Sequence, residues 1–191
     1  MMCADKRALR HALRAQRGNP EEAARQSSCI CRHILTSEAY CRARVIGGYM
    51  PLPHEADITP VLLDALRCGK TLALPRCQTP PNMTFHRVGS LETLITGAYA
   101  IPEPDAAAPQ IRPEEIDLLL VPLEGIDRRG FRLGKGGGYY DCLLGECRLL
   151  TMGCALDWQR TDELPADMWD QPLACCAFAD GLQWFSCEKD P

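Results

Sequence analysis

Residues 117–121 read DLLLV, an unbroken apolar run that follows a single acidic residue. Short apolar runs of this kind are typical of the central strands of a parallel sheet, because such strands are buried on both faces. Residues 44–50, RVIGGYM, form a similar run and lead into the proline-rich turn PLPHE at 51–55. The two runs predict two buried strands.

Helical patterns alternate with these strands along the chain. Leu9 and Leu13 share one stripe of an expected helix, and Pro20 with Glu21 and Glu22 suits the first turn of the next. We expect helices at 4–17, about 20–35, 60–69 (capped by Asp57 or Thr59) and about 139–146, strands at 71–74, 83–88, 149–156 and 174–179, and a long surface loop at 97–113. This alternation predicts an α/β sheet with right-handed crossovers.

Composition and charge exclude several classes of protein. The 191 residues are 46% hydrophobic and 24% charged, which is ordinary for a globular protein, and the net charge of -4 disfavours nucleic acid as a partner. No apolar run approaches the ~20 residues that span a bilayer, so no membrane segment is expected. The N-terminus is charged where a signal peptide is apolar. We therefore expect a cytoplasmic protein and, from its size, a monomer.

The twelve cysteines contain no CxxC pair. Structural zinc sites use paired ligands on both sides of the metal, and only Cys29 and Cys31, with His33 nearby, come close to such a pair. The density is also low for a disulfide scaffold. Most of these thiols are expected to be small buried apolar groups.

Residues 130–141, GFRLGKGGGYYD, carry the clearest chemical signal. Four glycines in five positions let backbone N–H groups point into one concavity, and a helix that starts directly afterwards adds its positive end. Arg132 and Lys135 contribute full charges. The segment matches neither the P-loop, because Gly136 stands where a hydroxyl is needed, nor the dinucleotide fingerprint, because Tyr139 replaces the last glycine. It is either a phosphate cradle of another type or a glycine-rich turn at a tight corner.

Two further segments carry charges of interest. Lys6, Arg10 and Arg14 recur at every fourth position and share one helical face, which is either a solvated basic face or a clamp for a polyphosphate. Glu55 follows a strand end, where open α/β sheets bind ligands, although it can equally be a solvated loop carboxylate. Asp141 and Asp170 are carboxylates able to hold magnesium.

Together these segments resemble the 5-formyltetrahydrofolate cyclo-ligase family, also called methenyltetrahydrofolate synthetase. The matching motifs are KRALR at 6–10, PLPHE at 51–55, DLLLVP at 117–122, GFRLGKGGGYYD at 130–141 and LPADMWD at 164–170. The resemblance covers nearly the whole chain. It implies one α/β domain over residues 1–191, with three layers, a mostly parallel central sheet flanked by helices, and a Rossmann-like arrangement.

The resemblance also implies an activity. Such enzymes use Mg²⁺ and ATP to convert 5-formyltetrahydrofolate into 5,10-methenyltetrahydrofolate, releasing ADP and phosphate. The formyl oxygen attacks the γ-phosphate, and the neighbouring folate nitrogen then closes the ring. Both substrates are small molecules.

Site residues follow from the same resemblance. Lys135 and Arg132 would be the catalytic cations, and Asp141 and Asp170 the metal ligands. The ATP-binding residues would be Lys6, Arg10, Arg132, Leu133, Gly134, Lys135, Gly136, Gly137, Gly138, Tyr139 and Tyr140. The folate-binding residues would be Glu55, hydrogen-bonded to the pterin, with Met50, Tyr99 and Tyr139.

The chain departs from the family pattern at several positions. Residues 123–126 read LEGI instead of Gly-Val-Ala-Phe, which puts the Glu124 carboxylate near the phosphate loop. The other departures are Cys142, Trp169, Ala174 and Phe178. They keep open a divergent member that acts on a non-folate substrate, or a non-catalytic protein that binds folate or nucleotide. The presence of Lys6, Lys135 and Asp141 argues against a pure binder.

Overall fold

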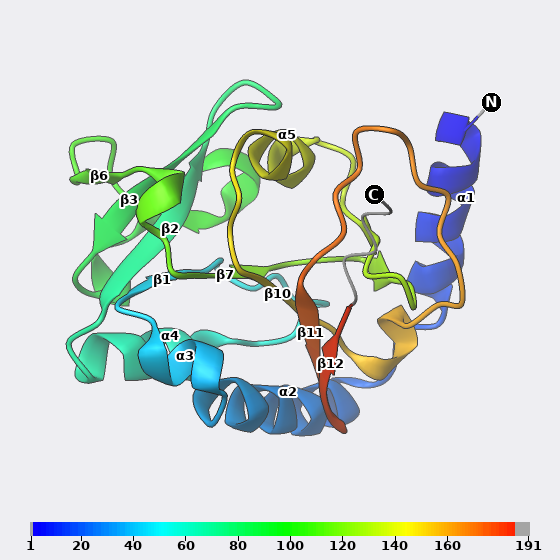
Figure 1. Cartoon of the computed structure of the whole chain (residues 1–191), viewed down its shortest axis with the longest axis horizontal. Coiled ribbons are helices and arrows are strands. Elements are labelled where there is room, and N and C mark those ends of the chain that lie inside the picture. The colour runs from blue at the N-terminus through cyan, green and yellow to red at the C-terminus, as the bar shows by residue number, and fades with distance from the viewer. Residues whose placement is uncertain (1, 186–191) are drawn as a thin grey trace, which may run out of the picture.

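The computed structural model describes residues 2–185, and its centre is an eight-stranded sheet of order β12-β11-β10-β7-β1-β2-β3-β6 (Figure 1). Its inner strands run parallel: β1 Val45–Gly47, β2 Thr71–Cys77, β7 Leu118–Val121, β10 Thr151–Cys154 and β11 Cys175–Phe178. The outer strands are antiparallel: β3 Met83–Val88, β6 Gln110–Ile111 and β12 Gly181–Trp184. The predicted mostly parallel α/β sheet is confirmed.

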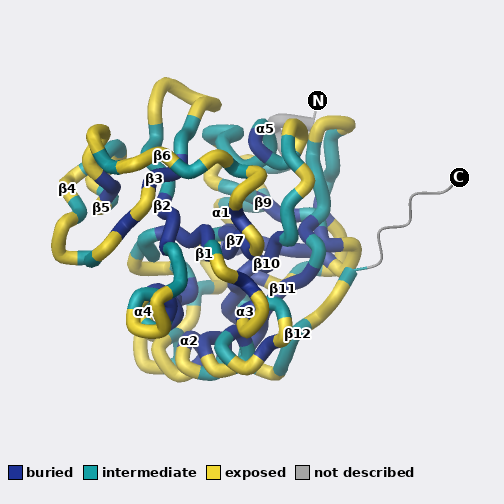
Figure 2. The backbone as a smooth tube through the Cα atoms, turned by 60° about the vertical axis from the view of Figure 1, so that its left-hand side comes forward, coloured by how far each residue is buried: buried dark blue, intermediate teal, exposed yellow. Residues whose placement is uncertain are grey.

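Helices cover both faces of this sheet (Figure 1). Helices α2 Pro20–Leu35, α3 Glu38–Arg42 and α4 Thr59–Arg67 lie on one side, and α5 Tyr139–Glu146 lies on the other. Strand β7 shows why: Leu118 and Leu120 belong to the core cluster under α2 and α4, whereas Leu119 and Val121 belong to the opposite cluster. Side chains alternate along a strand, so an all-apolar run fills two cores at once. Figure 2 shows the buried residues gathered along these strands.

Helix α1, Met2–Ala15, packs at the side of the sheet rather than over a large core (Figure 1). Its buried contacts form a small cluster of Leu13, Leu133 and Leu164, with Leu9 against it. Three buried side chains stabilise a helix only modestly. The position of α1 therefore depends strongly on its charged residues.

Local sequence signals set the start of some helices more clearly than others. Helix α2 starts as expected, because the Asn19 side chain accepts a hydrogen bond from the Glu22 N–H at 2.8 Å and Pro20 occupies the first turn. For α4 the predicted caps were wrong. Ile58 is the N-cap and Thr59 is already helical, while Asp57 accepts from the Thr59 N–H at 2.9 Å.

Several short elements were not predicted from the sequence. The expected loop at 97–113 contains the short elements η2 Ala98–Ala100, β5 Pro102–Glu103 and β6, with η3 Pro113–Glu115 beginning at its end. Strand β5 pairs with β4 Ile95–Thr96, and β8 Gly125–Ile126 pairs with β9 Arg132–Leu133. The remaining short helices are η1 Leu91–Thr93 and η4 Asp157–Gln159. Two-residue strands are too short to show a period of two, so their hairpins were not predicted.

The described cysteines are all free thiols. Cys31, Cys154, Cys175 and Cys176 are buried as expected, but Cys41 and Cys68 are exposed and the others half-buried, so the prediction that most are buried was wrong. Burial raises the pKa of Cys31 to about 11, which makes it an unreactive apolar group. Cys187 and the side chain of Cys3 lie outside the described part. No helix among residues 2–185 has both the length and the apolar character to cross a membrane.

Candidate active site

The loops with chemical signals follow three adjacent strands at their carboxyl ends. The turn at 51–55 follows β1, the glycine segment follows β7 through the β8–β9 hairpin, and the segment 164–170 follows β10. From β1 the chain crosses to β2 through α4, and from β7 it crosses the other way to β10 through α5. Connections that diverge from neighbouring strands leave a crevice at their carboxyl ends, where open α/β sheets bind ligands.

The glycine segment forms an open concavity above the start of α5. Gly136 and Gly138 have φ angles of 99° and 73°, a region that side chains avoid, and Gly138 is the N-cap of α5. A Cβ atom added at Gly134 would meet nothing within 4 Å, so the backbone there is open to a ligand. Backbone N–H groups beside a helix start are an anion site. These are the features that a phosphate cradle requires.

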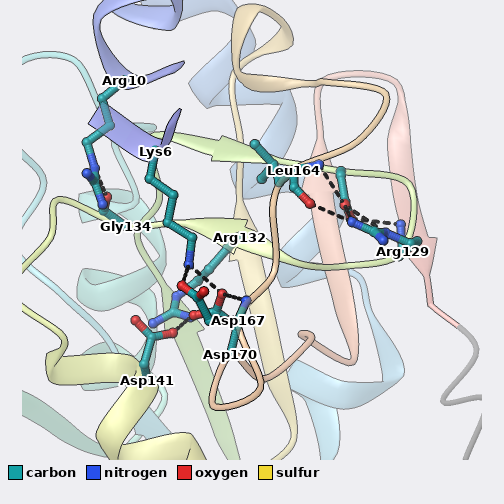
Figure 3. Close-up of polar contacts among 10 residues, drawn as sticks. Lys6, Arg10, Arg129, Arg132, Gly134, Asp141, Leu164, Asp167 and Asp170 are labelled. Atoms are coloured by element: carbon teal, nitrogen blue, oxygen red, sulfur yellow. Dashed lines mark hydrogen bonds and ion pairs between the residues drawn. The ribbon is translucent and has the colours of Figure 1, made fainter. Parts of the chain in front are cut away.

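Helix α1 places its basic face against this segment. Arg10 Nε donates to the Gly134 carbonyl oxygen at 2.7 Å (Figure 3). Lys6 Nζ lies 2.8 Å from Asp167 Oδ2 and 2.5 Å from Asp170 Oδ2. Burial lowers the pKa of Lys6, but the two carboxylates more than offset this and raise its pKa above the ordinary value. Lys6 and Arg10 therefore face the site and not bulk solvent.

Arg132 lies beneath the segment, where its side chain is only 3% exposed. Its Nη1 donates to Asp141 Oδ1 at 2.8 Å, and its guanidinium lies 5.7 Å from the centre of the Tyr140 ring. Its buried Nε has no hydrogen-bond partner. Leu133 is buried beside it, and Gly137 and Tyr140 continue the segment into α5. The structure thus places Arg132 as a buried charge behind the cradle.

The two expected metal ligands lie in neighbouring ion pairs. Figure 3 shows the Arg132–Asp141 pair next to Lys6 with Asp167 and Asp170. Sequence reasoning missed Asp167, although its spacing of three residues from Asp170 in LPADMWD was visible; its N–H donates to Asp170 Oδ2 at 2.7 Å. Among the described side chains, no group of three or more His, Cys, Asp or Glu is close enough to hold a metal by itself. Magnesium takes one or two carboxylates plus phosphate oxygens and water, so these carboxylates fit a metal that arrives with a phosphate.

Glu55 faces the glycine segment across a pocket of about 260 Å³. Its carboxylate accepts from the Leu52 N–H at 2.9 Å and lies 2.8 Å from Lys135 Nζ, and its side chain is only 8% exposed. Arg14, Arg17, His54 and Glu124 also line this pocket. The reading of Glu55 as a solvated loop carboxylate is therefore wrong, because Glu55 is buried and ion-paired.

The two aromatic residues expected beside a folate, Tyr99 and Tyr139, contact each other next to the glycine segment. The Tyr99 and Tyr139 hydroxyl oxygens are 3.3 Å apart, and the Tyr139 hydroxyl donates to the Gln78 carbonyl oxygen at 2.9 Å. Tyr99 is 67% exposed and adopts a φ of 57°, rare for a side-chain-bearing residue. Met50, half-buried, packs on the core behind the turn at 51–55. The structure brings Tyr99 and Tyr139 together from segments 40 residues apart.

Glu124 links α1 to the glycine segment through hydrogen bonds. Its N–H donates to the Leu133 carbonyl oxygen at 2.7 Å, and its buried carboxylate accepts from Arg14 Nη2 at 3.1 Å and Arg17 Nη2 at 3.4 Å. Burial raises the pKa of Glu124, but the hydrogen bonds and charge of Arg14, helped by Arg17, hold it below its ordinary value. The sequence predicted a carboxylate here and missed Arg17.

The contacts of the remaining departures, Trp169 excepted, are with α5 and with residues around β10 and β11. Cys142 Sγ contacts Glu146 Oε1 at 3.6 Å on α5, and Phe178 is buried in β11 under the Arg160 guanidinium. The Ala174 N–H donates to Thr151 Oγ1 at 2.9 Å. These residues serve the sheet and its helix. Trp169 lies between Asp167 and Asp170 and is 62% exposed.

Comparisons with known proteins agree over most of the chain. The model of the 5-formyltetrahydrofolate cyclo-ligase family matches residues 2–177. The 5-formyltetrahydrofolate cyclo-ligase of Escherichia coli K12 is 28% identical over 160 residues, covering 81% of this chain and 88% of that protein. The mouse protein of the same name is 28% identical over 178 residues, covering 86% and 87%.

Solved structures give the same picture for the fold. The 5,10-methenyltetrahydrofolate synthetase of Aquifex aeolicus superimposes with a TM-score of 0.85 at 29% identity, covering 97% of this chain and 95% of that one. The synthetase of Mycoplasma pneumoniae gives a TM-score of 0.74 at 23% identity, covering 92% and 99%, and supports the fold alone.

Proposed function

The chain belongs to the 5-formyltetrahydrofolate cyclo-ligase family, and from this premise we propose that it uses ATP and Mg²⁺ to convert 5-formyltetrahydrofolate into 5,10-methenyltetrahydrofolate. One observation carries the proposal beyond family membership. The ion pair between Lys135 and Glu55, at 2.8 Å, joins the glycine segment, where the phosphates would bind, to the carboxylate that would bind the pterin. A phosphate and a pterin bound at these two places would meet at Lys135.

The reaction asks the protein for position and charge. The formyl oxygen attacks the γ-phosphorus, an O–P bond forms, the bond to the β-phosphate oxygen breaks and ADP leaves. The neighbouring folate nitrogen then attacks the formyl carbon, loses its proton, and phosphate leaves as the ring closes. Phosphoryl transfer needs little covalent help from protein groups, and aligned reactants with neutralised charge supply most of the acceleration.

Three described cations of the site are paired with protein anions. Lys6 pairs with Asp167 and Asp170, Arg132 with Asp141, and Lys135 with Glu55. A triphosphate would replace these carboxylates as the partner of Lys6 and Lys135, while Arg10 and the backbone N–H groups of residues 134–138 hold the remaining oxygens. Asp170 would then be available for Mg²⁺, which neutralises phosphate charge, and Asp141, whose Oδ1 pairs with Arg132, would offer its other oxygen.

The folate half of the site is built around Glu55. A carboxylate that is nearly buried can accept hydrogen bonds from the amino and ring N–H groups of a pterin. Tyr99 and Tyr139 offer flat apolar surface beside it, and Met50 packs behind the turn. A polar anchor with aromatic walls is the usual composition of a site for a flat heterocycle.

A direct assay tests this proposal. Purified protein is mixed with 5-formyltetrahydrofolate, ATP and Mg²⁺, and the near-ultraviolet absorbance of the methenyl product is followed. We expect product formation that requires all three and stops when the metal is chelated. The matched control is Glu163→Gln, which removes an exposed carboxylate outside the crevice and should leave the rate unchanged.

The same assay separates the alternatives. Binding of both ATP and folate without product would identify a non-catalytic binder. ATP turnover only with a different formyl or amide substrate would identify a divergent member of the family. Either result would overturn the proposed conversion.

A further inference from the structure

The turn that follows β10 exposes two large apolar side chains. Met168 and Trp169 are its central residues, and the Asp170 N–H closes it onto the Asp167 carbonyl oxygen at 3.0 Å. Met168 is 93% exposed and Trp169 62%. The centres of such turns usually hold Gly, Pro, Asn, Asp or Ser, because these residues suit the backbone angles or hydrogen-bond the local backbone. A Met-Trp pair breaks this local rule, and such breaks concentrate at functional sites.

The ends of the same turn are firmly held. Asp167 and Asp170 both contact Lys6, at 2.8 and 2.5 Å, and their side chains are only 15% and 10% exposed. The Asp167 N–H also donates to Asp170 Oδ2 at 2.7 Å. The ends of the turn are therefore anchored to α1 while its tip stays uncovered. Because the backbone of the turn is already fixed at both ends, a ligand that binds its tip would lose little free energy in ordering the loop.

The order of the strands indicates which ligand this surface fits. The turn with Glu55 follows β1, the phosphate segment follows β7, and the Met-Trp turn follows β10, the next strand in the sheet. A nucleotide whose phosphates lie over the segment at 134–138, with its γ-phosphate toward Lys135 and Glu55, extends its nucleoside away from the folate. That direction leads to the β10 side, where Lys6 holds the turn.

We propose that Met168 and Trp169 form the wall against which the purine base of ATP stacks. The inference rests on the proposed function, since it places a part of the same ATP. Trp presents a large aromatic face to a base, and the Met thioether is polarizable and adaptable in shape. The charges that anchor the turn, Lys6 and its two aspartates, then act on the phosphates and the metal, while the tip binds the base.

Tryptophan fluorescence provides the test, with ATP and inorganic tripolyphosphate as the two probes. ATP is expected to quench the emission of the unmodified protein, whereas tripolyphosphate, which has no base, binds without quenching. Trp169→Phe should lose most of the quench and keep ATP affinity, because Phe still stacks. Trp169→Ala should weaken ATP binding about 10-fold, in line with the loss of one stacked base, and leave tripolyphosphate binding unchanged.

A matched control is Trp184→Phe, which removes a tryptophan that is 57% exposed on β12, at the edge of the sheet. This variant should retain the quench and the ATP affinity. Because Trp169 is exposed, Trp169→Ala should unfold at the same temperature as the unmodified protein, so any lost affinity reports on binding.

The results of these measurements distinguish this inference from the proposed function on which it rests. If the protein forms methenyl product but Trp169→Ala keeps its ATP affinity, the base does not stack there and the proposed function stands. Quenching of Trp169 by 5-formyltetrahydrofolate alone, and not by ATP, would assign the surface to the pterin and overturn the inference. A protein that neither binds ATP nor forms product overturns both.

Discussion

Lys135 Nζ lies 2.8 Å from Glu55 Oε1, and this contact joins the glycine segment to the turn at 51–55. Glu55 is nearly buried with its side chain 8% exposed, whereas Lys135 is 41% exposed and reaches in from the glycine segment. Because an isolated buried carboxylate is costly, Lys135 stabilises Glu55. If Glu55 binds the pterin as we propose, folate binding would release Lys135 for the phosphates.

Glu55→Gln is predicted to separate the two ligands. Folate affinity should fall by about 1.5–3 kcal/mol, the range for hydrogen bonds to a charged group, because a neutral amide replaces the carboxylate. ATP affinity should hold or rise, because Lys135 loses its competing partner. Titration calorimetry with each ligand alone measures both values.

The control for this variant is Glu163→Gln, the same change at an exposed carboxylate outside the crevice, which should matter little. Glu55 also accepts from the Leu52 N–H, so an altered turn would weaken both ligands. Equal losses for ATP and folate would show a structural role for Glu55 and contradict the pterin anchor.

Lys6→Ala is predicted to weaken ATP binding by roughly 1.5–3 kcal/mol, because it removes a charged donor from the phosphates. Lys6 forms ion pairs with Asp167 and Asp170, so the same change leaves two carboxylates without their cation. The paired control is Arg7→Ala, one position along α1, where the side chain is exposed. ATP titrations of the two variants that give equal affinities would show that Lys6 serves its ion pairs with Asp167 and Asp170 and not ATP.

Asp141→Asn is predicted to lower turnover far more than folate binding, because we propose that Asp141 positions the metal. The concentration of Mg²⁺ for half-maximal rate should rise, since one anionic ligand is lost. Steady-state rates over a magnesium series, together with folate titration, measure the two effects. Because Asp141 also pairs with the buried Arg132, urea unfolding is measured in parallel. Losses of equal size in turnover and folate binding would exclude the metal role.

Local patterns predicted the central elements because each pattern is contained in a few adjacent residues. The run at 117–121 identified β7, and the glycines ending at Gly138 placed the start of α5 at Tyr139 as observed. The four-residue spacing of Lys6 and Arg10 correctly put both on one face of α1. In these cases the physical cause, either strand burial or helical geometry, acts within one element.

Ion pairs between residues far apart in the sequence could not be predicted from local sequence patterns. Lys6 and Asp170 are 164 positions apart, and Arg17 meets Glu124 from 107 positions away. Such pairs depend on which loops the sheet order brings together, and one sequence does not contain that order in any short window. The hairpin that carries Tyr99 was missed for a related reason, because its two-residue strands show no periodicity.

Gly138→Ala tests the geometry of the phosphate segment. Its φ of 73° strains any side-chain-bearing residue by roughly 1–2 kcal/mol, and an added Cβ would otherwise meet only Pro81 at an ordinary 3.6 Å. We expect lower stability in urea and a higher KM for ATP, because the start of α5 must shift. Gly145→Ala, in the same helix and with open space around it, should instead stabilise by up to about 1 kcal/mol. A Gly138→Ala protein with unchanged KM would show that the left-handed turn does not position phosphate.

Glu124→Gln tests whether charge fixes α1 to the phosphate segment. The carboxylate is buried and accepts from Arg14 and Arg17, so the neutral variant should lose about 1.5–3 kcal/mol of stability at pH 7. The pKa of Glu124 is lowered in the folded protein, so its contribution is complete above the ordinary carboxylate pKa near ~4.3 and disappears as the pH falls through the lowered value. The stability difference between the two proteins should therefore shrink as the pH falls below about 4, because both then carry a neutral group.

Urea unfolding of both proteins at pH 7 and at successively lower pH measures this difference. Glu163→Gln is the matched control, because its ion pair with Arg129 is 3.1 Å long but 75% exposed on the glutamate side, and exposed pairs contribute less than about 1 kcal/mol. Amide hydrogen exchange in α1 adds a local readout, since this helix has few buried apolar contacts and should open more often without Glu124. A pH-independent difference, or unchanged exchange in α1, would mean that packing of Leu13 and Leu133, and not the Glu124 charge, holds the helix against the site.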